Sequence, residues 1–191
     1  MTAMSTPATP TAILRDQHRN ILKIADMLEH VLARAGDGGP DYDAVEDCVT
    51  FIRLYADALH HGKEEDLLFP ELISRGMRKD AGPIAVMLHE HAEGRRFART
   101  MAAELPGARG GDAEALGRLE RAGRGYVALI RGHIMKEDNI LFNMADQLID
   151  APACRSLCAA YDGVCQRRFD GCTVAELESI LARLVERYPS V

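Results

Sequence analysis

Apolar residues recur at intervals of three and four along most of the chain, and the strict alternation typical of β-strands is scarce. This spacing places apolar side chains on one face of an α-helix. The pattern therefore predicts five helical segments and no sheet. The first segment shows the stripe most clearly, in Ile13, Leu14, Ile21, Ile24, Leu28, Val31 and Leu32.

Glycine and proline mark the breaks between these segments. Pro10 suits the first position of the first helix, and the run 36–40, Gly-Asp-Gly-Gly-Pro, ends that helix. Pro70 is expected to bend or end the second helix, and Pro106 to end the third. The later segments are expected over residues 41–68, 83–105, 112–149 and 153–191.

Four long helices joined by short turns pack as antiparallel neighbours. We therefore predict an all-α fold, an antiparallel up-down four-helix bundle over residues 11–150. Residues 1–10 read as a disordered tail, and residues 151–191 as a helical extension that covers one side of the bundle. Within the extension, Thr173 and Glu176 match a capping box that begins a last helix.

The composition adds limits on the partners. The chain has 191 residues, of which 47% are hydrophobic, and a formal net charge of -6. This acidic balance argues against nucleic acid or an anionic membrane as the main partner, because both need a basic face. The sequence has no apolar run of membrane-spanning length, and its start, MTAMSTPATP, lacks a signal-peptide pattern. We expect a cytoplasmic protein that is a monomer or a dimer.

The chain has five cysteines, an odd number that argues against a disulfide framework. Four of them follow the predicted bundle, namely Cys154, Cys158, Cys165 and Cys172. We interpret them as small packed residues, and a thiol switch or an additional metal site is the alternative.

An internal repeat carries the functional argument. Histidines and glutamates in the two halves of the bundle correspond at one constant shift of 73 residues. Within each half, a histidine and a glutamate four positions apart share one helix face. The corresponding pairs are His18 with His91, His60 with His133, and Glu64 with Glu137.

Helix geometry allows these residues to meet across each hairpin. Eighteen residues lead from His18 to the turn at Gly36, and nineteen lead back from Asp41 to His60. At about 1.5 Å per residue the two helix lengths between the turn and each histidine agree. In the second hairpin the corresponding lengths, from His91 to Leu105 and from Asp112 to His133, are 14 and 21 residues. That difference of roughly 10 Å requires an irregular turn or a later start of the fourth helix.

The residue types point to metal chemistry. Imidazole suits iron, zinc and copper, whereas a carboxylate can bridge two ions. Four histidines and two glutamates are too many donors for one four-coordinate zinc, and they suit two ions that keep open positions. The donor types alone leave iron, zinc and manganese possible.

The whole pattern resembles the hemerythrin-like (HHE cation-binding) family. The motifs that carry this resemblance are HxxKEExxLFP at residues 60–70 and EHxxGR at residues 90–95, and it extends over roughly residues 11–150. The family implies a non-haem diiron centre with oxo or hydroxo and carboxylate bridges. On the matching positions it implies four terminal histidine ligands and two bridging glutamates, that is His18, His60, His91 and His133 with Glu64 and Glu137.

The sequence departs from this family at one position. Oxygen-carrying hemerythrins have a further histidine four residues after the one on the third helix, where this chain has Arg95. This departure favours binding of O2, NO or peroxide in stress response or sensing over oxygen transport. The alternatives are a diiron enzyme, either catalase-like or NO-reducing, and a protein that repairs iron centres or donates iron.

Several residues near the motifs have an open role. In an α-helix His61 points about 100° away from His60, and His89 likewise faces away from His91, so neither belongs to the predicted ligand set. Glu65 and its repeat counterpart Asp138 read as surface acids or as acceptors for a histidine N–H, of which we favour the first. Tyr126 either lines the site or packs in the core.

Overall fold

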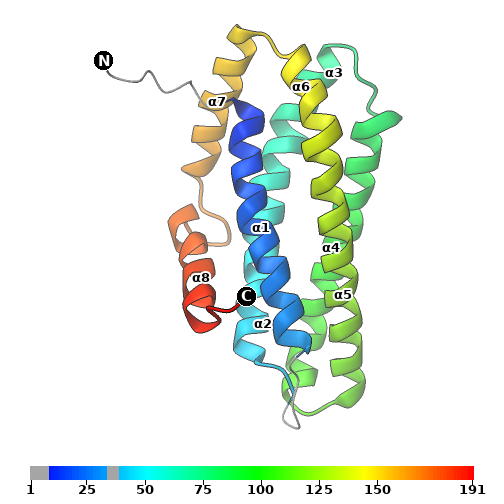
Figure 1. Ribbon diagram of the computed structural model, residues 1–191, viewed down its shortest axis with the longest axis vertical. Coiled ribbons are helices and arrows are strands. Elements are labelled where there is room, and N and C mark those ends of the chain that lie inside the picture. The colour runs from blue at the N-terminus through cyan, green and yellow to red at the C-terminus, as the bar shows by residue number, and fades with distance from the viewer. Residues whose placement is uncertain (1–8, 34–38) are drawn as a thin grey trace.

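Four helical rods run side by side, up and down the molecule (Figure 1). The structure is a computed structural model that describes residues 9–33 and 39–191, and no strand occurs in those residues. The first rod is α1 (Pro10–Ala33), and the third is α4 (Gly82–Arg109). The second rod joins α2 (Tyr42–Phe51), η1 (Ile52–His61), η2 (Glu64–Leu68) and α3 (Phe69–Ser74). The fourth joins α5 (Ala113–Lys136), η3 (Glu137–Leu141) and α6 (Phe142–Leu148).

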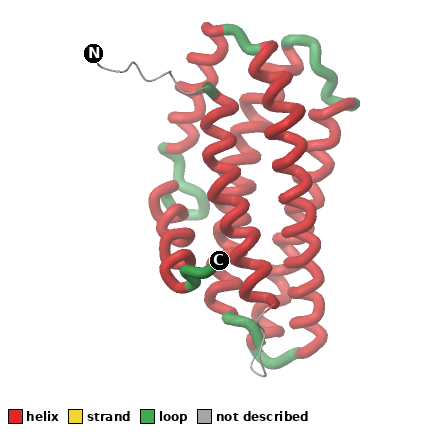
Figure 2. The backbone as a smooth tube through the Cα atoms, viewed as in Figure 1, coloured by secondary structure: helices red, strands yellow, loops and turns green. Residues whose placement is uncertain are grey.

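The predicted all-α bundle is therefore confirmed. Loops gather at the ends of the rods and beside the C-terminal helices (Figure 2). The predicted disordered tail lies largely outside the described residues, and so does most of the turn at 36–40. None of the helices in the described part of the chain combines the length and the apolarity that a membrane crossing needs.

Side-chain caps begin the helices where the sequence indicates. The Thr9 hydroxyl accepts a hydrogen bond from the backbone N–H of Ala12. Asp41 caps α2, Asp112 caps α5, and Thr173 forms the predicted capping box with its partner glutamate. Each cap satisfies N–H groups that have no partner inside the helix.

The helix end predicted at Pro106 is wrong, and at Pro70, where a bend or an end was expected, the helical rod continues. The second rod passes through Pro70 and ends at Ser74. The third rod continues through Pro106 to Arg109, because this proline lies in the last turn and the backbone bonds around it persist. Because α4 is longer than predicted, the helix lengths from His91 to the turn and from the turn to His133 become nearly equal, and the difference of roughly 10 Å predicted for the second hairpin nearly disappears.

π-helical segments, labelled η, interrupt the second and fourth rods. The segments Glu64–Leu68 and Glu137–Leu141 begin at the two repeated glutamates and are themselves related by the shift of 73. In each of them a backbone N–H reaches the carbonyl five residues back, from Phe69 to Glu64 and from Phe142 to Glu137. Such wide turns are rare and often mark functional sites. The segment Ile52–His61 occurs in the second rod alone.

A layer of buried polar residues divides the apolar core into two clusters. The smaller cluster contains Leu14, Phe69 and Phe142, and the larger one begins on α1 at Ile21. His18 lies between Leu14 and Ile21 on the same helix and is itself 1% exposed. The polar layer is therefore enclosed by apolar packing on both sides.

The C-terminal extension packs along one side of the bundle (Figure 1). It consists of α7 (Ala151–Cys165) and α8 (Val174–Arg187), which contact α1 and the second rod. Its buried side chains include Tyr161 on α7, and Leu177 and Leu184 on α8. These helices thus belong to the packed core.

Candidate metal centre

The structure brings all six sequence-predicted residues together in the polar layer. Their side chains are at most 2% exposed, although each is ionisable. Two groups of ligand atoms form there, and within each group the atoms lie within 4.8 Å of one another. The His18 group consists of His18, His60, Glu64 and Glu137, and the His91 group consists of His61, Glu64, His91 and His133.

Imidazole nitrogens converge on the centre of each group. The Nε2 atoms of His18 and His60 lie 3.0 Å apart, and those of His91 and His133 lie 3.2 Å apart. Two imidazole lone pairs at this distance repel each other unless a proton or a cation lies between them. The paired nitrogens therefore fit a bound cation.

The outer nitrogen of every histidine in the cluster has an acceptor of its own. The Nδ1 atoms of His18, His60 and His133 donate to Asp138, Gln17 and Glu90 at 2.9, 3.1 and 3.0 Å. Those of His61 and His91 donate to Asp57 and Glu65 at 3.2 and 2.7 Å. Carboxylate and amide oxygens accept the Nδ1 proton, which leaves Nε2 as the metal-facing nitrogen. Metal-binding histidines are held by this kind of outer hydrogen bond.

Glu64 and Glu137 lie between the two groups. The two oxygens of Glu64 face different histidines, Oε1 toward His60 at 3.7 Å and Oε2 toward His91 at 3.4 Å. Oε2 of Glu137 lies 3.1 Å from Nε2 of His18 and 3.2 Å from that of His133. Each carboxylate thus reaches both groups, as a bridge between two ions would.

No oxygen of Glu64 or Glu137 has a hydrogen bond of good geometry in the described part of the chain. Both glutamates are 0% exposed. A buried carboxylate without donors is unfavourable by several kcal/mol, so this pair requires positive charge nearby. The buried oxygens and the converging nitrogens together fit a pair of metal ions.

The electrostatics of the cluster show the same demand for positive charge. Burial and the charge of Glu137 raise the pKa of Glu64 to about 7. Burial lowers the pKa of His18, but the hydrogen bond to Asp138 and the contact with Glu137 outweigh it and raise the pKa to about 9. Burial also lowers the pKa of His133, but the charge and contact of Glu137, together with the hydrogen bond to Glu90, outweigh it and raise the pKa to about 10. The raised pKa values mean that these side chains retain protons, and bound metal ions would supply the same positive charge.

His61 was predicted to point away from the ligands, and the structure contradicts this. The side chain is 5% exposed, and its ring stacks on that of His91 with a centroid distance of 3.8 Å. The prediction assumed α-helical rotation between His60 and His61. A rotation of about 100° does not carry the neighbouring side chain out of the interior of this bundle, because the repeat counterparts His133 and Ile134 are also both buried, on the α-helical α5.

Glu65 and Asp138 were interpreted chiefly as surface acids, and that preference is wrong. Both accept a histidine Nδ1 proton, which was the less favoured interpretation. Glu90 and Gln17 do the same and were missed. The missed signal was the repeat itself, because Gln17 corresponds to Glu90 at the shift of 73.

Arg95 occupies a position beside the cluster instead of within it. Its guanidinium donates to Asp57 and to Glu65, with both distances 2.8 Å. These two carboxylates hold the outer nitrogens of His61 and His91. Arg95 therefore orients two histidines through their acceptors.

The structure also places the remaining residues whose role the sequence left undecided. His89 is exposed and lies outside both groups, as predicted. Tyr126 is 2% exposed, and its hydroxyl has no partner in the described part of the chain. Cys48 is buried and the other four cysteines are partly buried, and none forms a disulfide in the described residues.

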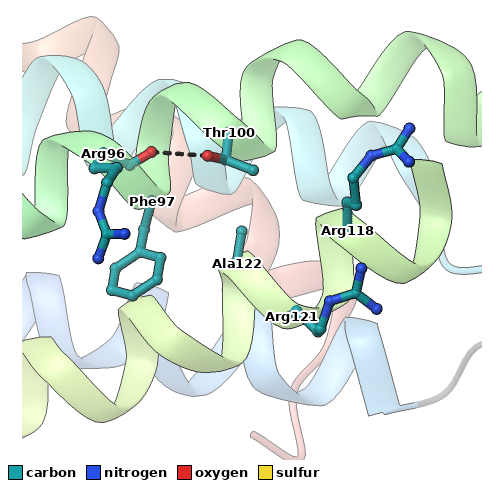
Figure 3. Close-up of a pocket in the computed structure, with 6 residues that line it drawn as sticks. All are labelled: Arg96, Phe97, Thr100, Arg118, Arg121 and Ala122. Carbon is teal, nitrogen blue, oxygen red and sulfur yellow. Dashed lines mark hydrogen bonds between the residues drawn. The ribbon is translucent and has the colours of Figure 1, made fainter. Parts of the chain in front are cut away.

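A surface hollow of about 260 Å³ lies between α4 and α5, apart from the cluster (Figure 3). Arg96 and Arg118 at its edge already pair with Glu93 and Glu104. Thr100 donates to the carbonyl of Arg96. The hollow has the chemistry of an ordinary charged surface, and its lining consists of Arg96, Phe97, Thr100, Arg118, Arg121 and Ala122.

Comparison with known proteins agrees with the geometry of the polar layer. The model of the hemerythrin HHE cation binding domain matches residues 9–145. No curated protein and no solved structure matches the chain. The family match covers well over half of the 191 residues and includes both groups of ligand atoms, so the chain belongs to the hemerythrin HHE cation-binding family.

Proposed function

We propose that this protein is a non-haem diiron protein that binds O2, NO or peroxide at the His/Glu cluster, in sensing or in the response to oxidative and nitrosative stress. His18, His60, His91 and His133 are the proposed terminal ligands, and Glu64 and Glu137 the proposed bridges. The observation that carries this proposal is the sharing of Glu64 by two groups of ligand atoms, both fully buried. Two adjoining groups with a common carboxylate suit two ions better than one.

Iron would supply redox chemistry and positions for a small exogenous ligand. The residues of the chain supply the surroundings. Burial excludes water from the cluster, and the outer hydrogen bonds hold each imidazole with Nε2 facing inward. A hollow of about 200 Å³ near the end of α5 is lined by Pro83, Val86, Met87, Lys136, Ile140 and Leu141, and none of the six proposed ligands lines it.

The deep burial of the donors also bears on the alternatives. A protein that donates iron to damaged centres needs an accessible or mobile site, whereas all six proposed ligands here are enclosed on both sides by apolar clusters. Ligand binding and turnover at the same centre remain as candidates. Oxygen evolution from peroxide, or consumption of NO, would assign an enzyme.

Metal analysis of the purified protein tests the proposal. Wild type should hold about two irons per chain, and His60→Ala should lose metal, because it removes one donor from the His18 group. His89→Ala, which changes an exposed histidine, is the matched control and should retain the metal. Addition of NO or peroxide should then change the absorption bands of the wild-type centre. Retention of full iron by His60→Ala would refute the ligand assignment.

A further inference from the structure

We propose that His61 is a fifth histidine ligand and that it gives the His91 group three imidazoles, while the His18 group has two. This inference rests on the proposed function, since it concerns the same centre. The six proposed ligands alone would give each group two histidines and would make the centre symmetric. His61 makes the two metal positions unequal.

The environment of His61 matches that of the other four histidines. Its Nδ1 donates to Asp57 at 3.2 Å. Its Nε2 is buried and has no hydrogen-bond partner in the described residues, and a ring nitrogen of His61 lies within 4.8 Å of the ligand atoms of Glu64, His91 and His133. A packing histidine buried in a core satisfies both nitrogens. His61 satisfies one nitrogen and leaves the other facing the proposed metal position.

The helix that carries His61 differs from its repeat counterpart. The segment Ile52–His61 is π-helical and contains both His60 and His61, whereas the corresponding part of α5 is α-helical. Both helix types bury two adjacent side chains here, since His133 and Ile134 on α5 are 2% and 3% exposed. π-helical segments often occur at functional sites, and this one ends at His61.

The internal repeat separates His61 from the symmetric frame. At the shift of 73, His61 corresponds to Ile134 and Asp57 to Ile130, both buried and without a donor atom. Arg95 corresponds to Leu22. Asp57, His61 and Arg95 are joined by hydrogen bonds in the structure. The connected polar set formed by these three residues therefore has no counterpart at the equivalent positions of the repeat.

This set accounts for the arginine at the position where oxygen-carrying hemerythrins have a histidine. Arg95 approaches from α4 and holds the acceptors of His61 and His91. His61 approaches the same group from the second rod. The third imidazole of this group thus comes from a different helix, and Arg95 is a positioning residue for it.

His61→Phe tests this assignment, because phenylalanine preserves a ring that can stack on His91 and removes the donor nitrogen. The matched control is His89→Phe, at an exposed position. Each protein is loaded with 57Fe(II) and passed through a desalting column. Iron per chain, affinity against a chelator and the Mössbauer spectrum are then measured. None of these measurements depends on activity.

Wild type is expected to hold about two irons and to show two Mössbauer components of equal area, because the ligand sets differ. His61→Phe should lose one component or bind one iron at least tenfold more weakly, and His89→Phe should match wild type. Two irons with unchanged affinity and spectrum in His61→Phe would overturn the inference and leave the proposed function intact. Absence of iron from wild type would overturn both.

A second variant keeps the test decisive if His61→Phe does not fold. His61→Ala leaves a space that free imidazole can enter. Recovery of the lost iron component on addition of imidazole, with His60→Ala as a comparison, would support a ligand role. A folded His61→Ala protein that retains both components without imidazole would refute it.

Discussion

Replacement of Arg95 by methionine should weaken metal binding without direct loss of a metal-facing atom. Arg95 makes two charge-assisted hydrogen bonds of 2.8 Å, to Asp57 and Glu65, and its side chain is 32% exposed. Fully shielded bonds of this kind contribute about 1.5–3 kcal/mol each. Partial solvent screening reduces this, so the expected loss of folding stability is roughly 1–3 kcal/mol in total.

The effect on metal follows from the acceptors that Arg95 holds. Without the guanidinium, two neighbouring carboxylates repel each other, and both His61 and His91 lose a fixed orientation. Loss of such outer contacts weakens metal affinity by about 10–100-fold, which corresponds to roughly 1.4–2.8 kcal/mol. Arg95→Lys should fall between wild type and Arg95→Met, because an ammonium lacks the planar fork that holds two carboxylates.

A chelator competition titration measures this loss, and the adjacent arginine provides the control. Arg96 is 61% exposed and pairs with Glu93, away from the cluster. Arg96→Met should leave metal affinity unchanged and alter stability by less than about 1 kcal/mol. Equal iron affinity in Arg95→Met and Arg96→Met would refute the argument that Arg95 supports the centre.

Three further predictions concern the rest of the molecule. Removal of iron should lower the melting temperature in calorimetry by roughly 5–11 °C, since free metal at a hundredfold excess over Kd stabilises by about 2.7 kcal/mol; equal melting with and without metal would contradict this. Leu177→Ala should cost about 2–5 kcal/mol in urea unfolding because Leu177 is 0% exposed, and Val185→Ala, at an exposed position of the same helix, should cost far less. Cys48 is fully buried, and burial raises the pKa of its thiol, so it should react with an aromatic disulfide reagent only on unfolding; immediate labelling of all five thiols would contradict this.

The sequence predicted which six residues meet, because a repeat is independent of helix detail. A constant shift of 73 paired His18 with His91 and Glu64 with Glu137 without knowledge of the backbone. Residues four apart on a helix share a face under small changes of helix geometry. The six residues therefore meet in the structure as expected.

The errors arose where the argument depended on local rules for a single helix. The position of His61 was judged from α-helical rotation alone, whereas adjacent positions of one helix can both be buried in a bundle, as His133 and Ile134 are. The proline signal placed the end of the third helix too early, since the helix continues through Pro106 to Arg109. Neither the width of the buried face of a helix nor the helix register around a proline follows from hydrophobic spacing.

The residues that accept the histidine Nδ1 protons could not be predicted without knowledge of the distances between helices. Glu65 and Asp138 follow the repeated glutamates, and nothing in their local spacing indicates a partner on another rod. In the structure Asp138 reaches His18 across 120 positions of sequence. Only the tertiary arrangement distinguishes such an acceptor from a surface acid.

The environment of Lys63, directly before Glu64, shows that the folded unit of this chain extends beyond the residues that the family model matches. Its repeat counterpart Lys136 pairs with Glu90, but the equivalent of Glu90 in the first half is the neutral Gln17. Lys63 lies instead over the ring of Tyr161, 5.4 Å from its centroid, and is 1% exposed. The family match ends at residue 145, whereas this aromatic partner comes from α7. A chain shortened to the matched residues would leave a lysine ammonium without its aromatic cover next to a proposed bridging carboxylate, so we expect such a chain to bind metal more weakly than the full chain.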